Sequence, residues 1–338
     1  MTETPVPVAV IGVGNMGANH ARVYDELPES ELVEFVEPNA TRARELEAEY
    51  GISVHETVDD ISRATAATVA VPNNHHREIA ERCLTAGLDI LVEKPLATTI
   101  ADAESIVETA EANDAILQVG HIERFNPVVQ SLKEILEDEE VIALEAHRLG
   151  PFNQHLSEMS VVFDLMIHDI DIIDWLVDGD IEHLNALGTT PRSEQVDHAV
   201  LQLKYGNDVL GIITASHVTH GKIRTLQVTT RDAYIEVDYQ DQSIVLQRRG
   251  IEETTTLLNQ SGYRTETATE SPYIQTREPL KNELEHFLEC VSTHETPRVS
   301  GADGVRAVAL TNDVADRILS TESSEMCQTT GDKTHETS

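Results

Sequence analysis

The sequence predicts an α/β fold in two parts: a doubly wound parallel sheet, followed by an α+β region with a large, mostly antiparallel sheet. In the first third of the chain, apolar runs of strand length alternate with helical segments, which is the pattern of βαβ units. Strands without intervening helices then fill about residues 184–247, and such a run indicates antiparallel or mixed sheet. A glycine-rich turn joins the first strand to the first helix.

The elements of the first third are set by apolar runs and by their end signals. Thr41 is expected to cap the second helix, and Gly51 and Gly87 to end the second and third. The expected strands are Val6–Ile11, Leu32–Val36, Thr68–Val71, Ile90–Val92 and Ile116–Val119. The expected helices are Gly17–Leu27, Thr41–Tyr50, His75–Ala86 and Thr99–Asn113.

The pattern changes after Gly120. "VIALEAHRLG" is a strand, and further strands follow between Leu184 and Gln247. The expected helices here are Asn126–Glu137, Val161–Val177, Pro279–Thr293 and Gly301–Leu319. The Ser/Thr-rich end of the chain is typical of disorder.

Composition limits the function classes. The chain has 338 residues, which suggests two domains, and a net charge of −36, which argues against nucleic-acid or anionic-membrane partners. No apolar run is long enough to cross a bilayer, and the N-terminus reads as a strand and not a signal peptide. Three distant cysteines indicate a reduced, cytoplasmic setting. Dispersed acidic residues, with six lysines against eighteen arginines, favour a halophilic source over an acidic mesophilic protein.

The glycine-rich turn is Gly12-x-Gly14-x-x-Gly17. These glycines permit a tight turn, close approach of a pyrophosphate and close helix–strand packing, the dinucleotide-binding pattern of a Rossmann fold. Glu37 ends the second strand, where a carboxylate accepts hydrogen bonds from ribose hydroxyls and repels a 2′-phosphate. NAD is therefore favoured over NADP, although Arg42 and nearby Arg44 keep NADP open.

Glu93-Lys94-Pro95 follows the fourth strand directly. The carboxyl edge of an open α/β sheet is where ligands bind, so we expect Lys94 beside the nicotinamide, oriented by Glu93. A lysine there exchanges a proton with substrate. The alternative is a surface ion pair at a strand end.

A second chemical group lies on the helix "VVFDLMIHDIDIIDWL". Asp164 and His168 are four residues apart and Asp171 three further, so they share one face of an α-helix. A carboxylate beside an imidazole forms an acid–base pair. The alternative is a solvated acidic face. A metal site of His75, His76 and His168 is weaker, because adjacent histidines point in different directions, and no metal is expected.

With these motifs, the sequence resembles the sugar dehydrogenases named for glucose–fructose oxidoreductase, inositol dehydrogenase and MocA (Gfo/Idh/MocA). The resemblance spans about residues 6–320 and rests on "GVGNMG", "VAVPNNHH", "VEKPLA", "VGHIERFNP", "DLMIHDIDIIDWL" and "PLKNELEHFLECV". "VGHIERFNPVV" and "RLGPF" look most like the branch that oxidises the 3-hydroxyl of UDP-N-acetylglucosamine. "NQHLSEMS" departs from that branch, with His155 where an arginine is usual.

The resemblance implies site residues. The family's lysine matches Lys94, and its Asp-x-x-x-His pair matches Asp164 and His168. Its Thr-Pro loop matches Val71 and Pro72, with the hydroxyl lost. The expected cofactor-binding residues are Gly12, Gly14, Asn15, Met16, Gly17, Glu37, Val71, Pro72, Asn73, His76, Glu93 and Lys94. The expected substrate-binding residues are Arg124, Asn126 and Asp171.

The leading functional prediction is NAD-dependent oxidation of a nucleotide-linked amino sugar by a homodimer or homotetramer. A free aldose or an inositol is the alternative substrate. A cofactor-binding regulator without catalysis is the alternative of another class. We expect an NAD-binding Rossmann domain at residues 1–122, a substrate-binding and oligomerisation domain at 123–320, and a disordered tail at 321–338.

Overall fold

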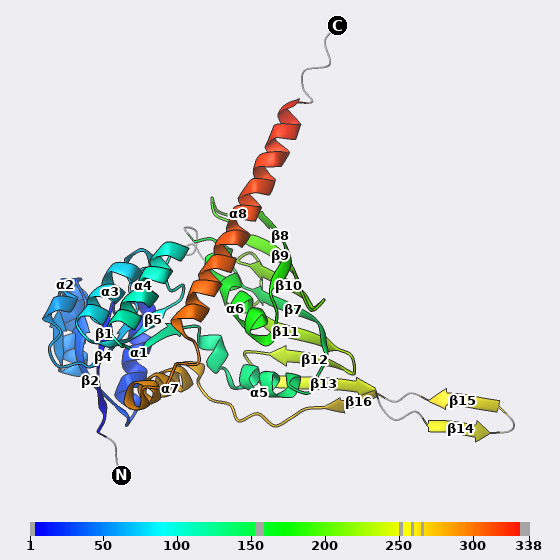
Figure 1. The fold of residues 1–338 in the computed structure, drawn as a ribbon, viewed down its shortest axis with the longest axis horizontal. Coiled ribbons are helices and arrows are strands. Elements are labelled where there is room, and N and C mark those ends of the chain that lie inside the picture. Colours follow the sequence, from blue (N-terminus) through cyan, green and yellow to red (C-terminus); the bar gives the residue numbers. More distant parts are fainter. Residues whose placement is uncertain (1–3, 153–158, 250–252, 258–259, 265–266, 332–338) are drawn as a thin grey trace, which may run out of the picture. The chain divides into compact units, whose positions relative to one another are not determined.

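A computed structural model describes residues 4–152, 159–249, 253–257, 260–264 and 267–331 (Figure 1). Contacts between residues divide the chain into two compact units. The first unit comprises residues 1–125 and 277–310, and the second unit comprises residues 126–276 and 311–338. The α/β fold class predicted from the sequence is confirmed, since a parallel sheet lies in one unit and a mostly antiparallel sheet in the other.

The first unit contains a six-stranded sheet in the order β3-β2-β1-β4-β5-β6, and every pairing in it is parallel. This order changes direction at β1, which places a ligand crevice at the carboxyl ends of the central strands. Sequence reasoning missed β3, which has three residues and no apolar run. The strands are β1 (Val6–Ile11), β2 (Ser30–Val36), β3 (Ser53–His55), β4 (Ala66–Val69), β5 (Asp89–Glu93) and β6 (Leu117–Gly120).

Helices bury both faces of this sheet. One apolar cluster joins α3 and α4 to the sheet, and another joins α1 and α7 to it. Asn39, and not Thr41, caps α2, because its side chain accepts the N–H groups of Thr41 and Arg42. The helices are α1 (Asn15–Glu26), α2 (Ala40–Tyr50), α3 (His76–Thr85), α4 (Ile100–Ala112) and α7 (Pro279–Thr293), with short 3₁₀ turns η1 (Val58–Asp60), η2 (Asn73–His75) and η3 (Ile122–Phe125).

Residues 277–310 belong to the first unit, although the sequence analysis expected them in the second domain. Leu284 and Phe287 of α7 are fully buried in the cluster that contains the β1 valines, so this late segment completes the core of the first unit. Helix α8 (Gly301–Gly331) also runs beyond the expected end at Leu319 and through part of the expected disordered tail. Residues 332–338 lie outside the described residues.

The second unit contains an eight-stranded sheet in the order β16-β13-β12-β11-β7-β10-β9-β8. Only β7 and β10 pair in parallel. Strands β14 and β15 pair with one another, and sequence reasoning missed both of them and β16. The strands are β7 (Val141–Leu149), β8 (Ile181–Thr189), β9 (His198–Tyr205), β10 (Leu210–Ser216), β11 (Ile223–Thr230), β12 (Ala233–Asp238), β13 (Ser243–Arg249), β14 (Glu253–Leu257), β15 (Gln260–Arg264) and β16 (Thr267–Glu270).

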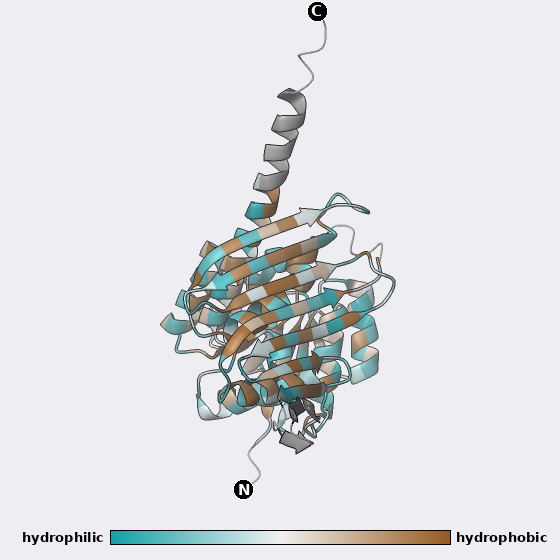
Figure 2. Ribbon diagram, turned by 90° about the vertical axis from the view of Figure 1, so that its right-hand side faces the viewer, coloured by the Kyte–Doolittle hydropathy of each residue, from teal (hydrophilic) through white to brown (hydrophobic). Residues whose placement is uncertain are grey.

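Alternating residues give this sheet two different faces (Figure 2). In β12, for example, Ala233, Ile235 and Val237 are buried, while Tyr234 and Glu236 are exposed. This alternation is typical of a sheet in which one face packs on helices. The helical elements of the unit are α5 (Pro127–Leu136), the π-helix η5 (Val162–Met166), α6 (Ile167–Leu176) and the part of α8 from Thr311.

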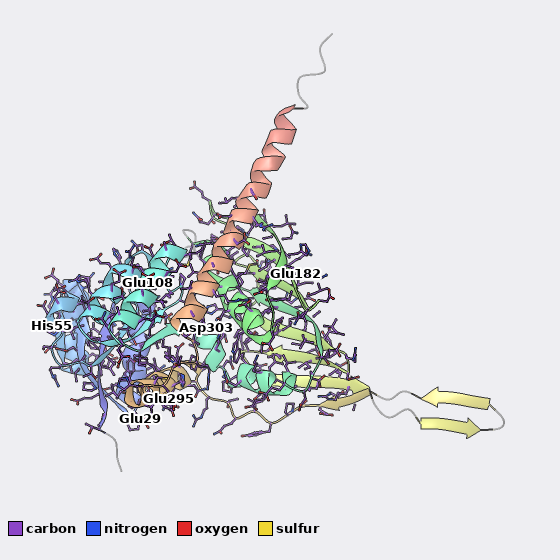
Figure 3. All side chains as sticks on the ribbon, in the orientation of Figure 1. Glu29, His55, Glu108, Glu182, Glu295 and Asp303 are labelled. Atoms are coloured by element: carbon purple, nitrogen blue, oxygen red, sulfur yellow. The ribbon has the colours of Figure 1, made fainter. Side chains whose placement is uncertain are left out.

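Acidic side chains cover the exteriors of both units. Figure 3 labels four exposed examples, Glu29, Glu108, Glu182 and Glu295. Such charges repel one another at low ionic strength. Among the residues that the structure describes, no helix is long and apolar enough to cross a membrane.

Candidate active site

The glycine-rich turn lies between β1 and α1. Gly12 has a φ of +79°, and a Cβ atom there would lie 2.8 Å from Val71 Cγ1 and 2.9 Å from the Ala70 carbonyl oxygen. A Cβ at Gly17 would lie only 2.0 Å from the Gly12 carbonyl oxygen. Gly14 has no heavy atom within 4 Å of the same position. Two glycines are therefore required by packing, and the third leaves the turn open to a ligand.

An open pocket of about 750 Å³ borders this turn. Glu37 lies at its edge, and its carboxylate accepts the Val13 N–H at 3.0 Å and the Asn39 N–H at 2.9 Å. Arg42 also lines the pocket, but its guanidinium donates to the Val13 carbonyl at 3.3 Å and to Glu45 at 3.1 Å. The lining residues are Val13, Gly14, Asn15, Ala18, Asn19, Glu37, Asn39 and Arg42.

This pocket fits the phosphates and ribose of a dinucleotide. The N-terminus of α1 offers unpaired N–H groups to phosphates, and Asn15 and Met16 in its first turn are exposed. Glu37 offers a carboxylate to ribose hydroxyls at the end of β2. Its two hydrogen bonds to backbone N–H groups fix the carboxylate in that position.

The segment after β4 contains Val71, Pro72 and Asn73, with Val71 outside the strand that was expected to include it. The His76 side chain is fully buried. Its Nδ1 lies 2.8 Å from the Pro95 carbonyl oxygen, and its Nε2 lies 2.9 Å from the Val71 carbonyl oxygen. Burial lowers the pKa of His76. His76 thus braces the Val71 segment against the turn that follows Lys94.

Glu93 ends β5 as a buried carboxylate, and Lys94 beside it is half-buried. Glu93 Oε1 lies 2.8 Å from His20 Nε2, and Glu93 Oε2 accepts the Lys94 N–H at 3.2 Å. Burial by itself would raise the pKa of Glu93, but the hydrogen bond and charge of His20, together with Lys94, lower it overall. The carboxylate beside Lys94 is therefore ionised at neutral pH, and an exposed surface ion pair does not describe it.

Asp164 and His168 lie on either side of a change in helix type. Asp164 lies in the π-helix η5, and His168 lies in the first turn of α6. The expectation of one regular α-helix was therefore wrong at Asp164, because the wider π turn changes which side chains share a face. Both side chains are half-buried.

A residue that sequence reasoning missed pairs with Asp164. His217 follows β10, has an exposure of 1%, and places Nε2 2.9 Å from Asp164 Oδ2. The His217 N–H donates to the Asp197 carbonyl oxygen at 2.8 Å. The only local signal was a histidine directly after a buried strand, "ITASHV".

The carboxylate of Asp197 anchors the segment before β9. It accepts the N–H groups of Arg192 at 2.7 Å and Ser193 at 2.9 Å. Burial alone would raise the pKa of Asp197, but a hydrogen bond from the Ser193 hydroxyl, these two N–H bonds and the charge of His217 lower it overall. The loop backbone and His217 are thereby held together behind Asp164.

A buried ion pair positions α6. Arg148 of β7 donates from Nε and Nη2 to the two carboxylate oxygens of Asp169, at 2.7 and 3.0 Å. Exposure is 3% for Arg148 and 1% for Asp169. Two parallel bonds restrict orientation as well as distance, so they fix the helix turn that carries neighbouring His168.

Of the three residues expected to bind substrate, Arg124 and Asn126 have structural contacts within their own units. Arg124 is 4% exposed and pairs with Asp303 at 3.1 Å. Asn126 caps α5 by accepting the Val128 N–H, and its amide donates to the Tyr239 carbonyl oxygen. Asp171 is 3% exposed. A substrate role for these residues stays a prediction, and His155 lies outside the described residues.

Within the described residues, no group of three or more histidine, cysteine or acidic side chains could hold a metal ion. His75 is exposed, whereas His76 is buried with both ring nitrogens against carbonyl oxygens.

Comparisons with known proteins match both units. The model of the oxidoreductase family with an NAD-binding Rossmann fold matches residues 6–121, and that of the GFO/IDH/MocA C-terminal domain matches residues 143–236. The chain belongs to the GFO/IDH/MocA family. It is therefore an NAD-binding oxidoreductase of the sugar and inositol dehydrogenase type.

Individual relatives of this GFO/IDH/MocA oxidoreductase differ in their substrates. It is 29% identical to UDP-N-acetylglucosamine 3-dehydrogenase from Acidithiobacillus ferrooxidans, over 89% of this chain and 93% of the relative. It is 26% identical to myo-inositol 2-dehydrogenase from Thermotoga maritima, over 90% and 93% of the two chains. A solved structure of the Acidithiobacillus enzyme GnnA superposes with a TM-score of 0.85 at 27% identity, covering 94% of this chain and 98% of that one.

Proposed function

We propose that this protein oxidises the 3-hydroxyl of UDP-N-acetylglucosamine with NAD. The observation that carries the proposal is the similarity to the Acidithiobacillus enzyme along nearly the whole chain, together with an ionised Glu93 beside Lys94. A free sugar or an inositol is the second candidate, because the similarity to an inositol dehydrogenase is equally extensive.

The chemistry divides between the cofactor and the side chains. NAD, when bound, supplies the hydride acceptor. The pocket beside Gly14 holds the phosphates and ribose, with Glu37 on the ribose hydroxyls. Loss of hydride from the sugar carbon leaves the hydroxyl proton for a base. Lys94 and His168 are the two candidates for that base, and Asp164, held by His217, lies four residues before the second.

The presence of Lys94, Asp164 and His168 argues against a regulator that binds cofactor without catalysis. A regulator has no need of a half-buried lysine beside an ionised, buried carboxylate, or of an acid held by a buried histidine. Catalysis needs both, because proton transfer requires bases in fixed positions.

The test is NAD reduction in molar KCl with UDP-N-acetylglucosamine, UDP-glucose, myo-inositol and glucose. Reduction with UDP-N-acetylglucosamine and a product oxidised at carbon 3 are the expected results. If inositol or glucose reacts and neither nucleotide sugar does, the substrate proposal is wrong and the oxidoreductase assignment stands. If no substrate reacts although NAD binds, the regulator becomes the better interpretation.

We also infer a homodimer or homotetramer. Large apolar side chains lie exposed on the eight-stranded sheet, including Leu187 at 53%, Leu210 at 46% and Ile223 at 42% exposure. Large apolar side chains exposed on a sheet face favour association. Light scattering at micromolar concentration in high salt is expected to give a multiple of the 37.3 kDa chain mass, and a monomer there would contradict the inference.

A further inference from the structure

A buried polar cluster lies behind the Lys94 turn, entirely within the first unit. His20 and Tyr24 come from α1, Glu93 from β5, Gln118 from β6 and Glu283 from α7. Each is at most 9% exposed, and Glu283 is fully buried. So many polar groups in an apolar core are costly unless they are paired or kept neutral.

The bond between His20 and Glu93 is the centre of the cluster. It measures 2.8 Å, and the His20 side chain is fully buried. Glu93 and Gly120 are partners on adjacent strands, and a Cβ at Gly120 would lie 3.1 Å from Glu93 Cα and 3.3 Å from its Oε2. A side chain at position 120 would thus press on Glu93, whereas glycine leaves room for its carboxylate.

Glu283 is the second carboxyl group of this cluster. Within the described part of the chain, both its carboxylate oxygens lack hydrogen-bond partners, as do His20 Nδ1 and Gln118 Oε1. Burial, followed by repulsion from Glu93, raises the pKa of Glu283 well above its ordinary value. The raised pKa and the two unpartnered oxygens favour the protonated, neutral form of Glu283, so that Glu93 holds the negative charge of this pair.

We propose that His20 is a positioning residue for Lys94, acting through Glu93, and that Glu283 is the neutral acid that lets Glu93 alone hold the negative charge. The role in turnover rests on the proposed function of Lys94. His20 lies one turn after Gly17 in α1, the helix whose N-terminus faces the dinucleotide pocket. The same helix thus contacts the phosphate site at one end and holds Glu93 further along.

Without His20, the buried Glu93 takes up a proton, because an unpaired buried carboxylate is unfavourable. Lys94 then loses the anion beside it, and more of its side chain is present as the reactive free amine. This consequence is independent of substrate, so it can be measured even if the proposed function is wrong.

The experiment is limited acetylation of the full-length protein with acetic anhydride. The rate at Lys94, divided by the rate at exposed Lys222, is measured by mass spectrometry of peptides. His20→Gln is expected to raise this ratio about threefold or more. The matched control is His55→Gln, which removes another histidine–glutamate pair of the same sheet, 3.2 Å long and joined to Glu34. An unchanged ratio in His20→Gln, or an equal rise in the control, overturns the proposal.

A second variant covers the case in which His20→Gln does not fold. Gly120→Ala places a methyl group against Glu93 and is expected to raise the Lys94 ratio in the same direction. Where substrate is turned over, either variant is expected to lower kcat about tenfold, or about 1.4 kcal/mol, because Lys94 is no longer held in position by Glu93 even though more of it is free amine. The KM for NAD is expected to change little. If acetylation changes and kcat does not, His20 positions Lys94 but Lys94 is not the base.

Glu283→Gln tests the neutral acid. The groups that face Glu283 are Glu93 on β5 and Tyr24 on α1. Because the folded pKa of Glu283 is raised, its proton stabilises the fold at low pH, and this contribution is lost as pH rises through the raised pKa. Glu283→Gln, which cannot ionise, is expected to keep the Lys94 ratio at pH 7 and to lose less stability than the unaltered protein at alkaline pH. A Glu283→Gln variant with the same pH dependence as the unaltered protein overturns this part.

Discussion

Each unit of this oxidoreductase contains a buried histidine bonded to a carboxylate that lies close in sequence to a candidate base. In the first unit, His20 holds Glu93 at 2.8 Å beside Lys94. In the second, His217 holds Asp164 at 2.9 Å, four residues before His168. The difference lies in their supports: His20 comes from the helix of the cofactor turn, and His217 from the end of β10. The first pair is therefore connected to the cofactor turn through its own helix and can respond to the cofactor. The second pair depends on β10, which lies far from the cofactor turn in sequence.

The largest expected effect comes from removing the bases. Lys94→Ala and His168→Ala are each expected to lower single-turnover NAD reduction by about 10²–10⁴-fold, the usual loss for a group in proton transfer. NAD affinity is expected to change little, because the Gly12–Gly17 turn is the proposed site of the phosphates. If only one variant loses activity, that residue is the base. If both keep near-normal rates on the best substrate, the assignment is wrong in both units.

The second prediction compares the two buried histidines. His217→Asn removes the bond from His217 to Asp164, a loss of about 1.5–3 kcal/mol for a bond to a charged group. That corresponds to roughly ten- to a hundredfold in kcat if the whole loss falls on the transition state. His198→Asn is the control, since His198 is half-buried on nearby β9. The measurement is kcat and the KM for sugar, and equal losses in the two variants would contradict a specific role for His217.

The first pair was partly predictable from sequence and the second was not. Gly12, Gly17 and Glu37 have roles fixed by local geometry, and Lys94 follows a strand whose apolar run is plain, so a short stretch of sequence determines each. Asp164 depends on a π turn and on His217, 53 residues away, and no periodic pattern encodes such a contact. His20 and Glu283 were missed for the same reason, because α1 and α7 meet β5 only in the folded unit.

A third prediction compares how these buried pairs and the exposed acidic surface respond to salt. Salt screens exposed charges far more than buried ones, and the net charge is −36. The melting temperature is therefore expected to rise steeply from dilute buffer to molar KCl, by about 2–4 °C for each kcal/mol of repulsion removed. The acetylation ratio of Lys94 is expected to change little over the same range. A flat melting temperature would show that the acidic composition is not an adaptation to salt.

The smallest expected effect concerns cofactor choice, which depends on one carboxylate. Glu37 is fixed by the N–H groups of Val13 and Asn39, at the position where a carboxylate is expected to accept hydrogen bonds from the ribose hydroxyls of NAD and to repel the 2′-phosphate of NADP. NAD is expected to bind more tightly than NADP. Glu37→Ala is expected to reduce the ratio of the two affinities about tenfold, or by about 1.4 kcal/mol in binding free energy. Arg42 sharpens the test, because it lines the same pocket but already donates to Val13 and Glu45. Glu37→Ala with Arg42→Ala is expected to bind NADP more weakly than Glu37→Ala alone if the Arg42 guanidinium reaches the 2′-phosphate. Titration calorimetry with both cofactors measures each affinity, and tighter binding of NADP by the unaltered protein would refute the role of Glu37.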